Sequence, residues 1–227
     1  MKRILLAGLF IAMQPAHAGV VIFGTRVVYP AEKQEVVVQL MNHGARSSLV
    51  QSWIDDGNTS LPPEKINVPF LLSPPVARIT GNSGQQLRIK KLANKLPANK
   101  ESLFYLNVLD IPPNTPGSEG ANTLRFAMQN RIKLFYRPKG IAAVNKDTFK
   151  SISLSSRKNA LHIANGSANW LTITEIKLSN VKVNERSVML APLSSQDVFL
   201  KNNLARQYSL TMIDDNGNFI SDRLNVK

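Results

Sequence analysis

The stretch from residue 122 to residue 138 combines large apolar side chains with cations. Leu124, Phe126 and Met128 alternate with other residues, so they share one face if the segment is a β-strand. Lys133 interrupts the apolar run that follows. A bulky apolar row beside a fixed cation could bind a ligand with an apolar strand face and a negative end. The terminus of a polypeptide chain has this chemistry.

The histidines give little support for catalysis or metal binding. His17 lies in the N-terminal leader, His43 follows an asparagine at a predicted turn, and His162 lies in a predicted strand. None of them has a second ligand type at metal-binding spacing. The sequence also lacks the G-x-S-x-G turn and the glycine-rich loops that hold phosphates or dinucleotides.

One pair of acidic residues has an alternative interpretation. Asp55 and Asp56 could form a catalytic carboxylate pair or part of a calcium loop. Gly57 and Asn58 follow directly, and this composition is typical of a solvated turn. We therefore expect no enzyme activity, no cofactor and no metal site.

The first 18 residues have the pattern of a signal peptide. Lys2 and Arg3 precede a short apolar run, and Ala16-His17-Ala18 is a small-x-small cleavage signal. The run is too short to span a bilayer. We expect bacterial export to the periplasm, a mature chain that begins at Gly19, and no membrane insertion.

The bulk composition limits the classes of partner. The formal charge is +13, and removal of Lys2 and Arg3 with the leader leaves 13 − 2 = +11. Such a charge can indicate nucleic-acid binding, but export and the scattered positions of the charges argue against it. A solvated basic surface is the simpler interpretation, and acidic proteins or anionic lipid head groups remain alternatives. The chain has no cysteine, so disulfides cannot stabilise it.

Period-two alternation dominates the first part of the mature chain and predicts seven antiparallel strands without intervening helices. The expected strands are Val20–Val28, Gln34–Met41, Ser48–Asp55, Pro69–Ile79, Gln85–Lys91, Ser102–Ile111 and Thr123–Tyr136. This number favours an immunoglobulin-like sandwich over residues 19–140. A proline-rich segment, 112–118, forms a loop before the long strand.

The alternation restarts after Pro138-Lys139-Gly140 and predicts a second, smaller β-sandwich over residues 141–227. The expected strands are Ser151–Leu154, Ala160–Ala164, Trp170–Lys177, Val181–Val183, Ser187–Leu190, Asp197–Leu200, Tyr208–Ile213 and Phe219–Asn225. Asn165-Gly166-Ser167 and Asp215-Asn216-Gly217 are predicted hairpin turns.

Several segments, in order along the mature chain, resemble the periplasmic pilus chaperones of the chaperone–usher pathway. They are Gly24-Thr25-Arg26-Val27-Val28-Tyr29-Pro30, Gln51-Ser52-Trp53, Glu101-Ser102-Leu103-Phe104-Tyr105-Leu106-Asn107-Val108, Arg131-Ile132-Lys133-Leu134-Phe135-Tyr136-Arg137-Pro138 and Asn169-Trp170-Leu171-Thr172-Ile173-Thr174. The resemblance implies an all-β fold of two immunoglobulin-like domains in a boomerang with a cleft between them. It also implies a chaperone that binds, folds and caps pilus subunits and delivers them to an outer-membrane usher.

The resemblance assigns roles to particular residues. Leu124, Phe126 and Met128, on a donor strand over residues 122–138, would fill the open groove of a subunit. Arg26 and Lys133 would anchor the C-terminal carboxylate of the subunit. The free chaperone could form a dimer that caps its own donor strands.

The resemblance further implies that Glu101, Arg137 and Asp215 form an ionic network between the domains. The fairly short loop before the donor strand and the absence of cysteine resemble the short-loop class of the family. Two other classes of protein are less well supported by the sequence. A pilus subunit would need a free N-terminal apolar extension, and a polysaccharide-binding module would need a face of exposed aromatic residues.

Overall fold

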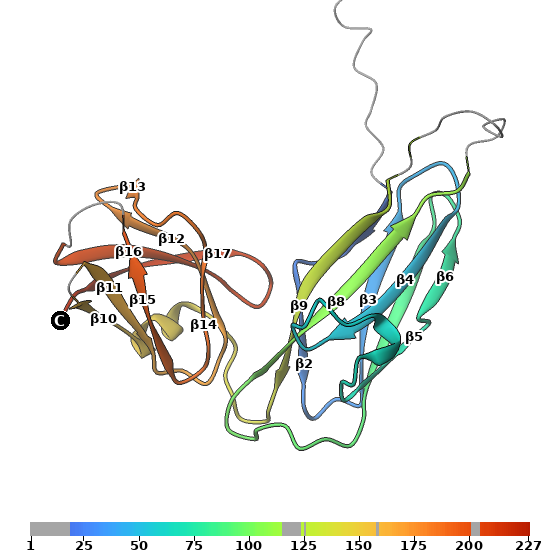
Figure 1. Cartoon of the computed structure of the whole chain (residues 1–227). Coiled ribbons are helices and arrows are strands. Elements are labelled where there is room, and N and C mark those ends of the chain that lie inside the picture. Colours follow the sequence, from blue (N-terminus) through green and yellow to red (C-terminus); the bar gives the residue numbers. More distant parts are fainter. Residues whose placement is uncertain (1–18, 115–123, 125, 158, 201–204) are drawn as a thin grey trace, which may run out of the picture.

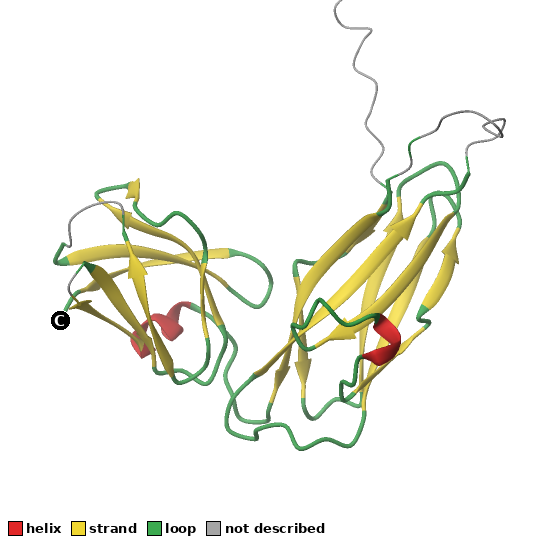
Figure 2. Ribbon diagram, viewed as in Figure 1, coloured by secondary structure: helices red, strands yellow, loops and turns green. Residues whose placement is uncertain are grey.

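The computed structural model describes residues 19–114, 124, 126–157, 159–200 and 205–227. Figure 2 shows that these residues form two groups of strands, each accompanied by a short helical turn. The turns are the 3-10 segments η2 (Pro63–Lys65) and η3 (Lys146–Ser151). The predicted all-β architecture of two sandwiches is therefore confirmed.

The N-terminal domain is a sandwich of two sheets. Its strands are β1 (Val20–Ile22), β2 (Arg26–Pro30), β3 (Glu35–Asn42), β4 (Ser48–Asp55), β5 (Phe70–Ser73), β6 (Val76–Ile79), β7 (Gly84–Lys91), β8 (Ser102–Ile111) and β9 (Met128–Arg137). One sheet has the order β1-β3-β7-β5, and the other has the order β2-β9-β8-β4-β6. The second sheet carries all the predicted site residues of this domain that lie in strands.

Two of the predicted strands are each split between the two sheets. The segment 20–28 breaks at Gly24, whose φ of 106° belongs to the left-handed region that favours glycine, so β1 joins β3 while β2 joins β9. The segment 69–79 breaks at Pro74 and Pro75, where the chain leaves β5 and enters β6 in the other sheet. The described part of the domain therefore has nine strands rather than seven, and β2 pairs with β9 in parallel.

The predicted long strand before Pro138 also begins later than expected. Leu124 and Phe126 lie outside any strand, Met128 is the first residue of β9, and residues 122, 123 and 125 lie outside the described residues. Met128 pairs with Asp110 near the end of β8. Pro112 and Pro113 come directly after the last residue of β8. Because proline has no N–H group to donate, the β8–β9 ladder ends there.

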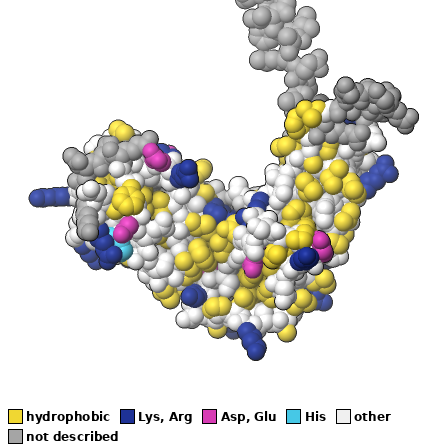
Figure 3. Space-filling model, in the orientation of Figure 1, with side chains coloured by type: hydrophobic (Ala, Val, Ile, Leu, Met, Phe, Trp, Pro, Cys, Tyr) yellow, Lys and Arg dark blue, Asp and Glu magenta, His cyan; other side chains and the backbone are white. Residues whose placement is uncertain are grey.

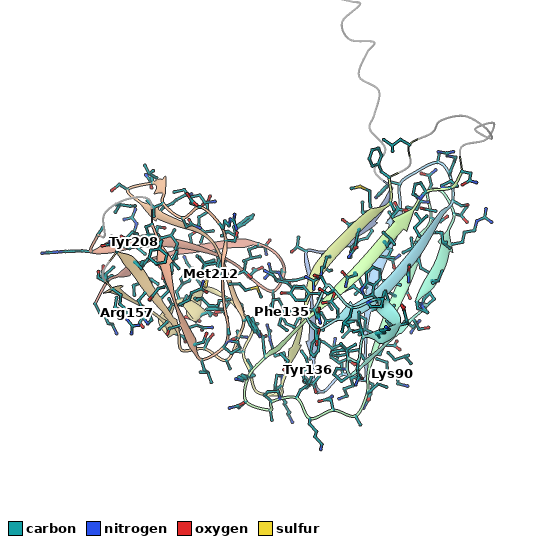
Figure 4. All side chains as sticks on the ribbon, viewed as in Figure 1. Lys90, Phe135, Tyr136, Arg157, Tyr208 and Met212 are labelled. Carbon is teal, nitrogen blue, oxygen red and sulfur yellow. The ribbon has the colours of Figure 1, made fainter. Side chains whose placement is uncertain are left out.

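The core of the N-terminal domain fixes which face of β9 points outward. Leu134 and Tyr136 belong to the buried core, where Tyr29, Phe70, Phe104 and Tyr136 form aromatic contacts with centroids 5.0 to 6.1 Å apart. The alternating residues Lys133, Phe135 and Arg137 therefore face away from that core. Phe135 is nevertheless buried, and Figure 4 shows it on the side of the domain that faces the second domain.

The C-terminal domain is a smaller sandwich. Its strands are β10 (Ile152–Arg157), β11 (Ala160–Asn165), β12 (Leu171–Leu178), β13 (Val181–Lys182), β14 (Val188–Leu190), β15 (Ser194–Phe199), β16 (Gln207–Ile213) and β17 (Phe219–Asn225). One sheet has the order β10-β11-β15, and the other has the order β13-β12-β16-β17, with β14 paired to β12. Buried residues such as Phe149, Leu161, Ile173 and Tyr208 fill its core.

One of the two predicted hairpins in this domain is wrong. The segment 165–167 connects β11 to β12, which lie in different sheets, because Asn165 donates to the carbonyls of Asn169 and Ala191 and turns the chain across the sandwich. The turn at residues 215–217 does join neighbouring antiparallel strands, β16 and β17, as predicted. Gly217 has a φ of 88°, which explains the need for glycine there.

Figure 1 shows the two sandwiches set at an angle, with the loop between β16 and β17 reaching toward the first domain near β2 and β9. This arrangement is the predicted boomerang. Hydrogen bonds between the domains involve β2, β9 and the residue just before β8 on one side. On the other side they involve β12, the residue just before it, the end of β16 and the β16–β17 loop.

Candidate functional site

Two cations of the N-terminal domain lie side by side at the junction of the domains. Arg26 is the first residue of β2, and it stands opposite Lys133 in the parallel register of β2 and β9. The turn at Gly24 places Arg26 at this position, because it redirects the chain from one sheet into the other. Figure 3 shows Lys and Arg side chains on the concave surface between the two lobes.

Both cations reach the second domain through neutral acceptors. The Nζ atom of Lys133 donates to Oγ1 of Thr172 over 3.0 Å, and an Nη atom of Arg26 donates to the carbonyl of Ile213 over 3.3 Å. The Nε atom of Arg26 is buried and has no hydrogen-bond partner within the described chain. Neither cation forms an ion pair with any residue that the structure describes. The pair is therefore able to accept an anion from outside.

The electrostatics of the pair favour the arrival of negative charge. Burial lowers the pKa of Lys133, and the positive charge of Arg26 lowers it further. Burial also lowers the pKa of Arg26, against the opposing effect of the carboxylates of Asp215 and Asp214. A carboxylate bound between the two cations would relieve both their repulsion and their poor solvation.

The residues predicted to form an ionic network between the domains are in contact. Arg137 donates from Nε to Glu101 over 2.5 Å and from an Nη atom to Asp215 over 2.8 Å, with a further bond to the other oxygen of Asp215. Burial opposes the charge of Arg137, but these carboxylates outweigh it and raise its pKa. The side chain of Arg137 is 9% exposed, so the network is largely shielded from solvent.

Glu101 extends this network into the second domain through atoms that the sequence did not indicate. Its carboxylate accepts from the backbone N–H of Trp170 over 2.7 Å and from Nδ2 of Asn169 over 3.2 Å. Its own N–H donates to the carbonyl of Ala168 over 2.9 Å. The resemblance includes Asn169, Trp170 and Thr172 without assigning them a role, whereas the carbonyl of Ile213 carried no signal.

A close approach of the Gly217 backbone to the side chain of Thr25 reinforces the same junction. A methyl group on Gly217, in the β16–β17 turn, would lie 2.7 Å from Oγ1 of Thr25, just before β2. The turn that carries Asp215 therefore packs directly beside the strand that carries Arg26. This contact fixes the distance between the network and the cation pair.

The three predicted groove-filling side chains are exposed. Leu124 is 80% exposed, Phe126 is 68% exposed and Met128 is 63% exposed. They do not face the domain's own core, which was the alternative interpretation of their alternation. The neighbouring strand β2 pairs with residues 133–137 of β9. Among the described residues, no strand pairs with residues 128–132 on that side of β9.

A polar cluster on the outer face of the same sheet was missed. Asp55 is 2% exposed, and its carboxylate accepts from Arg131 over 2.5 Å and from Asn107 over 2.6 Å. The guanidinium of Arg131 also lies 3.7 Å from the centroid of the Tyr105 ring. The predicted turn is present, and residues 56–58 are exposed as expected. The expectation that Asp55 itself is solvated is wrong, because an arginine 76 residues away pairs with this buried carboxylate.

The structure offers no support for a metal centre. Within the described residues, no group of three or more His, Asp or Glu side chains could hold a metal ion. His162 contacts Asp197 over 2.5 Å on the face of β11 and β15, and no third metal-binding side chain joins them among the residues described. No helix in the described part of the chain is long and apolar enough to cross a membrane.

Comparisons with known proteins identify the family. Residues 19–142 match the model for pili and flagellar-assembly chaperones, PapD N-terminal domain, and residues 147–223 match the model for the pili assembly chaperone PapD, C-terminal domain. The chain is 63% identical over 224 residues to the probable fimbrial chaperone YehC of Escherichia coli K12, covering 99% of this chain and 94% of that protein.

Solved structures agree with this assignment. The CupB2 chaperone of Pseudomonas aeruginosa superimposes with a TM-score of 0.78 at 29% identity, covering 91% of this chain and all of that one. The periplasmic chaperone SfaE superimposes with a TM-score of 0.73 at 27% identity, covering 92% of this chain and all of that one. The chain therefore belongs to the PapD-like family of pilus assembly chaperones. Membership in a family of chaperones also supports the prediction that it is not an enzyme.

Proposed function

We propose that the chain binds, folds and caps pilus subunits in the periplasm by donor-strand complementation and then delivers them to an outer-membrane usher. The observation that carries the proposal is the pair of unpaired cations, Arg26 and Lys133, beside a strand that exposes three large apolar side chains. A subunit that lacks one strand of its sandwich offers both complementary features, an apolar groove and a chain terminus.

The cation pair acts as the anchor for the C-terminal carboxylate of the subunit. Arg26 has a buried Nε donor to offer, and Lys133 can exchange its neutral partner Thr172 for a charged one. A fixed chain end also sets the register of the subunit strand along β9. Register matters because a slip of one residue turns every side chain to the opposite face.

Leu124, Phe126 and Met128 act as the groove-filling side chains. Burying a side chain of this kind contributes about 1.5–3 kcal/mol, so three of them supply several kcal/mol before the cost of association is subtracted. Two free chaperones could also cover these side chains by forming a self-capping dimer. The exposure of all three in the single chain supports both uses.

The Glu101–Arg137–Asp215 network holds the two domains at the angle that forms the cleft. Charged networks of this kind add little net stability, so orientation is its main contribution. We further propose a leader over residues 1–18, which lies outside the described residues, and domains over 19–140 and 141–227. The periplasmic location of the similar chaperone SfaE and the sequence pattern of the leader support export.

Co-purification from the periplasm tests the proposal. The chain is expressed with the pilus subunits encoded beside its gene, as wild type and as Lys133→Ala. We expect a soluble one-to-one complex with wild type, and loss of both the complex and the subunit with the variant. Lys139→Ala, which alters an exposed lysine just after β9, is the matched control and should behave as wild type.

Two other outcomes separate the parts of the proposal. A complex that survives Lys133→Ala would retain the chaperone function but move the carboxylate anchor elsewhere. A folded wild-type chain that binds none of the neighbouring subunits would contradict subunit binding itself.

A further inference from the structure

Three carboxylates of the described chain are almost completely buried. Asp55 is 2% exposed, Glu101 is 3% exposed and Asp110 is 6% exposed. Asp55 is paired with Arg131, and Glu101 is paired with Arg137. Asp110 forms no ion pair with any described residue. Burying a carboxylate without a counter-ion costs free energy, so a cation beside Asp110 would stabilise the fold.

The donors that surround Asp110 are neutral. One carboxylate oxygen accepts from the backbone N–H of Val20 over 2.9 Å, and the other accepts from the hydroxyl of Ser48. The hydroxyl of Ser48 also lies 3.0 Å from the carbonyl of Ile111. These bonds hold the carboxylate at the point where β1, β4 and β8 meet.

Gly19 lies against this carboxylate. A methyl group built on its Cα would be only 2.2 Å from Oδ2 of Asp110, and the next residue already donates its N–H to the same oxygen. The carbonyl of Gly19 accepts from the N–H of His43 over 3.2 Å, which ties the residue to the end of β3. The atoms of Gly19 are thus held beside the negative charge.

We propose that the α-ammonium group of Gly19, released by cleavage of the leader, is the counter-ion of Asp110. The inference rests on the proposed processing site before Gly19. An uncleaved chain has an uncharged peptide bond at this position, whereas the mature chain has a cation with a pKa of about 7.7–8.0. Processing would therefore complete a buried ion pair and dock β1 onto the end of β8.

The location gives the ion pair a consequence for binding. Asp110 faces Met128 in the register of β8 and β9, at the first residue of β9. Gly19, Asp110, Phe126 and Met128 line one shared hollow. Docking of the amino terminus would therefore support the start of β9, where the groove-filling side chains Phe126 and Met128 lie.

Arg46 is the competing cation, because it lines the same hollow. It is exposed and forms no ion pair among the described residues. A test must therefore separate the amino terminus from Arg46.

Thermal unfolding of matched chains provides this test and needs no subunit. One chain begins at Gly19, as checked by intact mass, and a second carries two added alanines before Gly19. Each is made as wild type, Asp110→Asn and Arg46→Gln. We expect Asp110→Asn to lower the Tm by about 4–8 °C in the chain that begins at Gly19, and by much less in the extended chain. The extension alone should also lower the Tm of the wild type.

Equal effects of Asp110→Asn in both chains would overturn the inference, since the carboxylate would then act through Val20 and Ser48 alone. A loss of the same size with Arg46→Gln would assign the counter-ion role to Arg46. If Asp110→Asn fails to fold, the Tm values of the extended and unextended wild-type chains test the ion pair instead. Equal Tm values for these two chains would count against it. A periplasmic product with a different first residue would contradict the processing site, while a chain cut to begin at Gly19 still tests the pairing.

Discussion

Arg137 in β9 forms two hydrogen bonds with Asp215, which lies 78 residues further along the chain in the turn between β16 and β17. The same guanidinium bonds to Glu101, whose carboxylate accepts from the backbone of Trp170. Arg137 thus contacts the second domain directly at Asp215 and indirectly, through Glu101, at Trp170. The proposed orienting role of the network therefore rests on this side chain.

Replacing Arg137 should destabilise the chain and loosen the angle between the domains. Arg137→Met leaves Glu101 and Asp215 without their cation, and removal of one partner from a buried ion pair costs about 3–5 kcal/mol. Denaturant unfolding measures the loss, and small-angle X-ray scattering measures the domain arrangement. Lys139→Met is the control at an exposed position. An unchanged unfolding midpoint and scattering curve would show that the network orients nothing.

Replacing Lys133 should stabilise the free chaperone while it removes subunit binding. Burial and the charge of Arg26 both lower the pKa of Lys133, so the charged side chain is held at a cost in the unbound protein. We expect Lys133→Met to raise the Tm by about 1–3 °C in thermal unfolding without subunit. A clear drop in Tm would mean that the contact with Thr172 outweighs the repulsion.

Replacing the exposed apolar row should weaken subunit binding without affecting the fold. Phe126→Ser should lower the affinity by about tenfold or more, because the ring would no longer fill the groove. Its exposure of 68% in the free chain predicts an unchanged Tm. Isothermal titration with a purified subunit measures the affinity. Phe219→Ser, which alters a similarly exposed phenylalanine in β17, is the control and should bind normally.

Asp55 should contribute to the loss of stability in acid. Although burial opposes ionisation of Asp55, the hydrogen bonds from Arg131 and Asn107 outweigh it and hold its pKa below the ordinary value. The contribution to stability is therefore complete above the unfolded pKa of about 3.9, and it is lost as the pH falls through the lower folded pKa.

The variant Asp55→Asn tests this pH dependence. Its stability deficit, measured by urea unfolding between pH 7 and pH 2, should be largest at neutral pH and should shrink as the pH falls below about 4. Asp56→Asn alters the exposed neighbour and should show little deficit at any pH. A deficit for Asp55→Asn that is constant over the whole range would contradict the argument.

Local patterns predicted most of the strands because alternation and turn residues act over a few neighbours. The strands Ser48–Asp55, Ser102–Ile111 and Phe219–Asn225 have the predicted bounds. The splits at Gly24 and at Pro74-Pro75 were missed, since alternation continues through a point where the chain changes sheets. The parallel pairing of β2 and β9 was also missed, because pairing depends on residues about 100 positions apart.

The candidate site, like the fold, was only partly predictable from the sequence. The exposed apolar row and the two cations could be recognised from their residue types and spacing, and the family resemblance supplied their roles. The carbonyl of Ile213 and the N–H of Trp170 are backbone groups that any residue could supply, so residue types gave no indication of them. The burial of Asp55 depends on Arg131 in a distant strand, which a local turn pattern cannot reveal.

The most direct test of the account is the affinity of the chaperone for a synthetic peptide that copies the C-terminal strand of a subunit. The peptide is prepared with a free carboxylate and as an amide, and each is titrated against wild type and Lys133→Ala. We predict that wild type prefers the carboxylate by about tenfold or more, and that the variant loses most of this preference. Equal binding of both peptides to wild type would contradict the carboxylate anchor at Arg26 and Lys133.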